Sequence, residues 1–484
     1  MKTVALVAGS LLALLLLLSI PGPRPPVAPA PARGGAFAWN QDDYWRSLQR
    51  RYVEQRAAGC ETAASRSARE RTELGRDADR LSATPVAADA AVLDSMERRF
   101  FALGPLIAAC PAGLEDYVQL SGRLREAIKW QSRRWDVTNA IARARLYRSL
   151  YGMRGAVEAV MLHHPAQANA LLQGRPVPST TPATTIQGVE IHSGDILVSR
   201  GGYPTSALIA RGNDYPGNFS HVGLVYVDST THVASVIEAH IERGVAISTA
   251  DAYLQDKKLR IMVLRLRADL PALARDPMLP HRAAALALQR AQGHVAYDFE
   301  MDYTDAGKLF CSEVASSVYR ELGVTLWTGL STISSAGLRR WLADFGVRYF
   351  ETQEPSDLEY DPQLVVVAEW RDPQALLKDH VDNAVIDAML EGAGRGDQLD
   401  YPWYQLSAIR LAKGWSWVVE RFGAIGPVPE GMSARAALRH RSFSERQRRI
   451  AAQVTDDATR LGAQQGYPPP YWGLLDLARA RTRL

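Results

Sequence analysis

The chain has 484 residues, of which 47% are hydrophobic and 22% charged, an ordinary balance for a globular protein of two or three domains. Its formal net charge of +4 is too small to indicate nucleic-acid binding, and no helix-turn-helix, zinc-finger or RNA-binding signature occurs. Its glycine-rich segments lack the Lys-Ser/Thr pair of a phosphate-binding P-loop, so this class of nucleotide hydrolase is excluded.

An apolar segment follows Lys2 at the N-terminus. The run Thr3–Ile20 contains no charged residue, and as a helix it would be roughly 25–27 Å long, slightly less than a hydrocarbon core of about 30 Å. We expect residues 1–20 to be a signal anchor or a cleaved signal peptide. The protein would then be inner-membrane-anchored and face the periplasm, or be secreted to it, with the Pro/Ala-rich residues 21–39 as a semi-rigid linker.

Residues 40–173 are predicted to form a helical module, because apolar residues recur at helical spacing in segments such as Leu114–Trp135. This module contains Cys60 and Cys110, whereas Cys311 stands alone later in the chain. In an oxidising compartment the simplest arrangement is one Cys60–Cys110 disulfide and one free thiol. Three separate buried thiols are the alternative. Residues 174–187, rich in Pro, Ser and Thr, are predicted to be a linker.

Residues 188–372 are predicted to form an α+β domain, in which antiparallel strands pack against the helix that starts at Cys311. The Gly-, Pro- and aromatic-rich residues 201–218 are expected to be a loop that forms one wall of a substrate cleft. The strand patterns lie at 195–199, 221–227, 233–241, 259–266 and 364–370, and the helical ones at 282–292 and 311–322.

Cys311 is the candidate nucleophile of this domain. It begins an amphipathic helix, where the helix dipole favours the thiolate. About ninety residues upstream, His221 begins an apolar strand, and an imidazole facing the thiol would supply the general base that a cysteine nucleophile needs. By itself, a buried cysteine on such a helix is more often a small core residue.

The candidates for a third catalytic residue are Glu238 and His240. Together with Glu242 they share one face of a predicted strand, because side chains alternate along a strand. Either could orient His221, and a carboxylate would also stabilise the imidazolium, which favours Glu238. A solvated strand face is the alternative. These residues have no recognised metal-ligand spacing, so we expect neither a metal nor a cofactor.

The combined motifs resemble the permuted papain-like (permuted NlpC/P60) superfamily, and within it the YiiX/YaeF-type amidase-like family, over roughly residues 186–370. The resemblance implies a circularly permuted papain-like core in which the Cys311 thiolate attacks an acyl carbon and His221 acts as general base and then as general acid. It also points to Glu238 as the third member. The matching stretches are Gly194-Asp195-Ile196-Leu197, Ser220-His221-Val222-Gly223, Val236-Ile237-Glu238-Ala239-His240, Tyr297-Asp298-Phe299 and Phe310-Cys311-Ser312-Glu313.

The candidate substrate contacts are Tyr203, Tyr297 and Asp298, although the Tyr297-Asp298 pair is expected mainly to shape the loop before the nucleophile. Residues 373–484 are predicted to be a helical extension, with helices at 375–389, 403–422 and 435–454. Its aromatic and basic residues are expected to pack against the preceding domain. Contact with a membrane interface or a glycan is the alternative.

These observations favour a cell-envelope cysteine hydrolase that cleaves amide bonds in peptidoglycan stem peptides or related amino-acid conjugates, through Cys311, His221 and Glu238. One alternative is a lipid acyltransferase or thioesterase of the lecithin:retinol-acyltransferase-like type, which belongs to the same superfamily. Another is a non-catalytic envelope scaffold that binds peptides.

Overall fold

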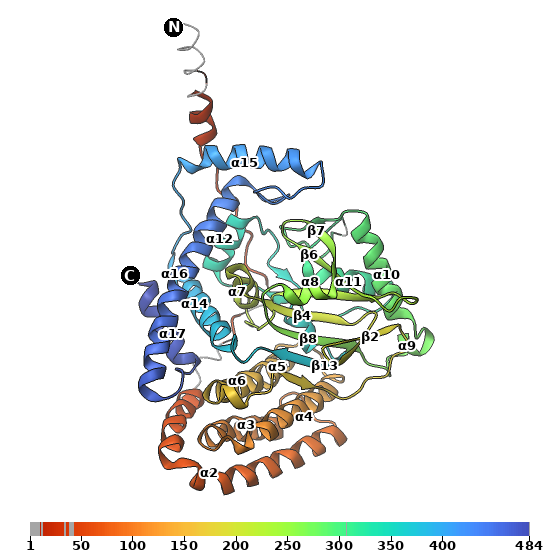
Figure 1. Cartoon of the computed structure of the whole chain (residues 1–484), viewed down its shortest axis with the longest axis vertical. Coiled ribbons are helices and arrows are strands. Elements are labelled where there is room, and N and C mark those ends of the chain that lie inside the picture. The colour runs from red at the N-terminus through yellow and green to blue at the C-terminus, as the bar shows by residue number, and fades with distance from the viewer. Residues whose placement is uncertain (1–9, 11–12, 33–34, 38–42, 306, 484) are drawn as a thin grey trace.

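The computed structural model describes residues 10, 13–32, 35–37, 43–305 and 307–483. Residues 1–9 and 11–12 of the predicted N-terminal segment 1–20 lie outside these residues, and residues 13–19 are helical. In the ranges that the structure describes, no helix combines the length and apolar character needed to cross a membrane. A helical module, a central sheet and a C-terminal group of helices follow one another along the chain (Figure 1).

The N-terminal module is helical, as predicted, and its apolar positions form one core around Leu74, Phe100 and Tyr117. Cys60 and Cys110 form a disulfide that joins the first helix of the module to the end of the second. Cys311 is free, so the arrangement with one disulfide is the one present. The helices are α2 (Asp43–Ala83), α3 (Ala91–Ala109), α4 (Leu114–Ser132), α5 (Ala140–Tyr147) and α6 (Met153–His163), with short 3-10 or π turns at Pro111–Gly113, Arg148–Gly152 and Pro165–Gln167.

The central sheet has seven strands in the order β1-β13-β8-β4-β5-β6-β7, and every neighbouring pair is antiparallel. The α+β class and the antiparallel sheet are therefore confirmed. The strands are β1 (Leu171–Gln173), β4 (Ile196–Gly201), β5 (His221–Val227), β6 (Ala234–His240), β7 (Gly244–Thr249), β8 (Lys258–Leu266) and β13 (Leu364–Arg371).

The two faces of the sheet are covered differently. Side chains such as Val222 and Leu224 point to one face, where they pack against α10 (Leu279–Gln292) and α11 (Cys311–Glu321). Alternation places His221, Val225, Glu238 and His240 on the other face. That face is covered by a hairpin of β2 (Ala183–Ile186) and β3 (Val189–His192) and by α8 (Ala250–Gln255). The predicted linker 174–187 thus contains the strand β2.

The C-terminal extension is helical, and α14 (Leu376–Arg395), α16 (Ala434–Gln465) and α17 (Tyr471–Thr482) share a core with α7 (Pro204–Arg211) and α12 (Ala336–Phe345). These helices therefore pack against the preceding domain, but the aromatic side chains Trp403, Tyr404, Trp415 and Trp417 are exposed, so the packing predicted for them is wrong. The remaining helix, α15 (Gln405–Glu420), lies at one end of the molecule (Figure 1). Shorter elements are α9 (Pro271–Arg275), α13 (Asp357–Tyr360), β9 (Ala296–Tyr297), β10 (Lys308–Leu309), β11 (Ser331–Thr332) and β12 (Glu351–Thr352).

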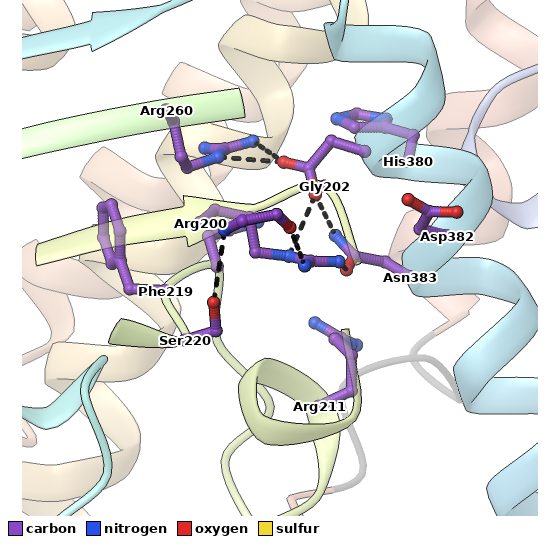
Figure 2. Close-up of polar contacts among 12 residues, drawn as sticks. Arg200, Gly202, Arg211, Phe219, Ser220, Arg260, His380, Asp382 and Asn383 are labelled. Atoms are coloured by element: carbon purple, nitrogen blue, oxygen red, sulfur yellow. Dashed lines mark hydrogen bonds and ion pairs between the residues drawn. The ribbon is translucent and has the colours of Figure 1, made fainter. Parts of the chain in front are cut away.

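A buried charge network joins the three parts of the chain behind the end of β4. Asp379 of α14 lies 2.6 Å from a guanidinium nitrogen of Arg260 on β8 and 3.4 Å from one of Arg200 on β4. Arg260 also pairs with Glu158 of the helical module at 2.6 Å. Figure 2 shows Arg200 and Arg260 pointing towards the helix that carries His380, Asp382 and Asn383.

This network positions the start of β5, the strand that follows β4 in the chain. Its arginines are fully buried, and breaking such a pair by removing one partner costs about 3–5 kcal/mol. The end of β4 held by Arg200 contacts Ser220, whose backbone N–H donates to Ser199 at 2.9 Å and whose Oγ lies 3.4 Å from the nitrogen of Gly201. The network therefore fixes the chain immediately before His221 (Figure 2).

Candidate active site

Cys311 is the first residue of α11 and lies beside the start of β5. Phe310 precedes the helix in an extended conformation, and its N–H donates to the carboxylate of Glu313 at 3.2 Å, which caps the first turn. The apolar face of α11, including Val314 and Val318, packs on the sheet. The Cys311 sulfur thereby lies 4.0 Å from the carbonyl oxygen of Ser220, the residue before His221.

Glu238 connects the two histidines of the site. Its Oε2 lies 2.6 Å from Nε2 of His221, and its Oε1 lies 3.1 Å from Nε2 of His240. Ser248 of β7 donates its hydroxyl to the same Oε1 at 2.6 Å. The carboxylate is 2% exposed, so all these contacts are made away from bulk solvent. Both candidates for the third member thus lie beside one another, with Glu238 in contact with His221.

The electrostatics of the site differ from the expectation for the thiol. Burial raises the pKa of Cys311 to about 12, and the nearby Glu354 carboxylate acts in the same direction. Burial also lowers the pKa of His221, although the hydrogen bond to Glu238 opposes that shift. At neutral pH the pair is therefore a thiol and a neutral imidazole. Burial therefore acts against the thiolate that the start of a helix favours.

Glu238 remains ionised beside this neutral pair. Burial alone would raise the pKa of the Glu238 carboxyl, but hydrogen bonds from His221 and His240 outweigh it and hold the pKa well below its usual range. A buried anion that touches an imidazole stabilises the imidazolium formed when that ring accepts a proton. The arrangement is thus suited to general-base chemistry at His221. Within the described ranges, no group of three or more His, Cys, Asp or Glu side chains is arranged to hold a metal ion.

A cavity of about 650 Å³ brings Cys311 and His221 to a common surface. Tyr203 and Tyr297, two of the predicted substrate contacts, also line it. Residues 201–209 form one wall as predicted, but part of the expected loop is the helix α7.

Asp298 does not line this cavity, so the substrate contact suggested for it is corrected. Its carboxylate accepts the backbone N–H groups of Glu300 and Asp302 at 2.9 and 2.6 Å, which shapes the loop before α11. Asp195 is likewise a structural residue, because it accepts the N–H of His192 and pairs with Arg265 at 2.8 Å.

Sequence reasoning missed the cationic side chains of the cavity. Lys258 of β8 lines it with a side chain only 5% exposed, paired to Asp256 at 3.0 Å and lying 4.4 Å from the ring centre of Tyr253. Its positive charge also contributes to lowering the pKa of His221. No local motif marks Lys258, and only its strand position places it in the site.

The C-terminal extension supplies the opposite wall. His440, Arg441 and Arg448 of α16 line the cavity, and Nε2 of His440 lies 2.5 Å from the hydroxyl of Thr205 on the first wall. Residues from α15 and the loop after it, such as Ile409 and Pro429, complete this side. These residues are about one hundred or more positions from Cys311 along the chain, so no spacing in the sequence identifies them.

Residues 190–368 match the model of a family described as permuted papain-like amidase enzyme, YaeF/YiiX, C92 family. The match runs from β3 into β13 and includes Cys311, His221 and Glu238, whereas α15 and α16 lie outside it. Comparison with curated proteins and with solved structures gave no match. The matched family consists of papain-like amidases, which makes cysteine-dependent amide hydrolysis the enzyme class of this domain. Over residues 190–368 the chain is thus similar to the permuted papain-like amidase family of YaeF and YiiX.

Proposed function

We propose that this protein is a cell-envelope cysteine hydrolase that cleaves an amide bond in peptidoglycan stem peptides or related amino-acid conjugates. The observation that carries the proposal is the cavity in which Cys311 and His221 meet, with the Glu238 carboxylate directly behind His221. A nucleophile, a base and a residue that orients the base are the parts that amide hydrolysis by a cysteine enzyme requires.

In the proposed reaction, the Cys311 sulfur attacks the amide carbonyl carbon while its proton passes to Nδ1 of His221. Nε2 is the ring nitrogen engaged by Glu238, so Nδ1 is the one left for this transfer. The backbone N–H of Cys311, at the first position of α11, has no acceptor within the helix and meets the oxyanion. His221 then gives its proton to the leaving amine nitrogen, and a thioester remains. Water hydrolyses that thioester to release the carboxylic acid and restore the thiol.

The charges around the cavity support a substrate with a carboxylate. Arg448 lies on the wall formed by α16 beside Arg441, which pairs with Glu445, and Lys258 on the wall formed by the sheet pairs with Asp256. Stem peptides and amino-acid conjugates carry free carboxylates near their amide bonds, and guanidinium groups bind carboxylates well. The cell-envelope location is supported by the charge-free run Thr3–Ile20 and by the Cys60–Cys110 disulfide, which is typical of oxidising compartments.

The test combines covalent labelling with turnover. Purified protein is treated with a thiol-directed electrophile and examined by intact-mass analysis, and is then incubated with peptidoglycan fragments. We expect one mass addition that maps to Cys311, release of a free amine from the fragments, and loss of both in Cys311→Ala. Thermal unfolding of the variant provides the control for folding. Wild-type turnover by Cys311→Ala on a fragment that the unaltered protein cleaves would contradict the proposed mechanism.

Acyl transfer from a lipid is a second candidate, favoured by an apolar cavity of about 270 Å³. It lies on the sheet face that carries His221, and its lining includes Val225, Val236 and Tyr253. Parallel incubation with phospholipid separates the two candidates, because a fatty acyl adduct on Cys311 would identify the lipid reaction by its mass. Consumption of peptidoglycan fragments with no acyl adduct from phospholipid would identify amide hydrolysis.

A further inference from the structure

The helix α15 carries an apolar stripe on its solvent side. Leu411, Trp415 and Val418 recur at spacings of four and three residues, which places them along one line of the helix. Tyr404, the residue before the helix, and Phe422, two residues after its end, continue the pattern at spacings of seven and four. All five are exposed, from 37% for Val418 to 85% for Phe422. We call these five residues the α15 stripe. Soluble proteins rarely leave a contiguous apolar surface uncovered, so the stripe indicates an interaction site.

A second exposed apolar surface lies beside it. Leu14, Leu16 and Leu17 of the N-terminal segment are exposed, and Arg410 of α15 donates to the carbonyl oxygen of Leu18 at 2.8 Å. Figure 1 shows the described N-terminal helix standing next to α15 at the same end of the molecule. In the sequence, these leucines belong to the run Thr3–Ile20, which is free of charge.

We propose that the α15 stripe docks on the surface of a phospholipid bilayer. Trp, Tyr and Phe side chains are favoured at the boundary between headgroups and acyl chains, and an amphipathic helix binds there lying parallel to the membrane plane. The contact between Arg410 and Leu18 makes the stripe continuous with the most apolar segment of the chain. A bilayer accounts for both surfaces at once, whereas a second copy of α15 would cover only the stripe.

One basic residue of α15 fits the same partner. Arg410 donates to the carbonyl oxygen of Leu18, a contact that leaves its positive charge for anionic headgroups. Ile409 of this helix and Pro427 and Pro429 of the following loop line the cavity that contains Cys311. Docking of α15 therefore sets the catalytic cavity beside the bilayer surface. This inference concerns a surface and does not depend on which bond the enzyme cleaves.

The test places an environment-sensitive fluorophore on the stripe in the full chain. Leu411→Cys is made in a Cys311→Ala background, so that the label reacts at one position while Cys60 and Cys110 remain paired. The matched control is Leu461→Cys, another exposed leucine on a helix, in α16. Vesicles of phosphatidylethanolamine and phosphatidylglycerol are added, with and without bromine on the acyl chains.

We expect a blue shift and bromine quenching for the label at position 411 and neither for the label at position 461. Adding Val418→Glu and Phe422→Glu should remove the shift at position 411 while the N-terminal segment still brings the protein to the vesicles. Absence of a shift at position 411 on vesicle-bound protein would overturn the proposal. A shift that appears without vesicles and grows with protein concentration would also overturn it, because it would assign the stripe to a second copy of the chain.

Discussion

Oε2 of Glu238 lies 2.6 Å from Nε2 of His221, and the contact joins two neighbouring antiparallel strands of the sheet. Because Glu238 is buried and ionised, it holds the ring in one orientation and supplies the negative charge that an imidazolium needs. His240 reaches the other oxygen of the same carboxylate, at 3.1 Å. The two strands thus determine which nitrogen of His221 faces the substrate cavity.

Glu238→Gln should lower the rate of Cys311 acylation by at least roughly tenfold, since it removes the charge that stabilises protonated His221. His240→Gln is the comparison and should have a smaller effect, because a neutral amide can still donate to Glu238. Single-turnover acylation of Cys311 measures both. A greater loss in His240→Gln would assign the orienting role to His240 and favour the acyltransferase alternative.

The protonation states predict an unusual pH dependence for the thiol. With the pKa of Cys311 raised to about 12 by burial, its thiolate fraction should increase about tenfold per pH unit across the neutral range. Alkylation of Cys311 by iodoacetamide, followed by intact mass, should therefore accelerate steadily with pH. An alkylation rate that is constant from about pH 6 to 8 would instead indicate a preformed thiolate–imidazolium pair.

The enzyme should stay active at a lower pH than an ordinary histidine base would allow. Burial lowers the pKa of His221, so its neutral, proton-accepting form persists below the usual value of about 6.5. On the acid side, the midpoint of the kcat/KM profile is therefore expected below about pH 6.5. A midpoint at or above that value would contradict the assignment of His221 as a buried neutral base.

Arg448→Gln should raise KM for a substrate with a carboxylate several-fold and leave kcat nearly unchanged, because the side chain lines the cavity on the wall opposite the sheet. Arg449→Gln is the matched control, since Arg449 is exposed on the same helix and does not line the cavity. Steady-state kinetics measure the KM of both variants for a substrate with a carboxylate and for its amidated analogue. Equal effects on both substrates would exclude a carboxylate contact.

Asp379→Asn should destabilise the fold by about 3–5 kcal/mol, because it leaves the buried Arg260 and Arg200 without one of their anions. Glu445→Gln breaks an exposed pair with Arg441 and should cost less than about 1 kcal/mol. Urea unfolding compares the two variants. Similar losses in both would show that the buried network contributes no more than a surface ion pair.

Local patterns predicted the parts of the site that depend on neighbouring residues. The strand His221–Val227 was predicted at its observed bounds, and the helix at Cys311 and its end before Gly323 were also expected. Gly323 adopts the positive φ of 84° that such a helix end favours. Strand alternation likewise placed Glu238 and His240 on one face.

Properties that depend on distant packing were not predicted. The extent to which Cys311 is buried, and hence its protonation, follows from how α11 docks on the sheet. The contribution of Arg448 depends on α16 folding back over the cavity from outside the family match. The strand β7 was missed because only the first two residues of the segment Gly244–Thr249 are buried, which weakens the apolar pattern.

The position of β13 ties the family domain to the helical module. On one side β13 pairs with β8, and on the other it pairs with β1, the strand that directly follows that module. Its residue Glu369 also receives Arg125 and Arg154 from α4 and α6. A fragment of residues 188–372 would lack β1, which would expose the edge of β13, and would leave the buried Glu369 without Arg125 and Arg154. The amidase domain of this chain is therefore expected to need the helical module in order to fold.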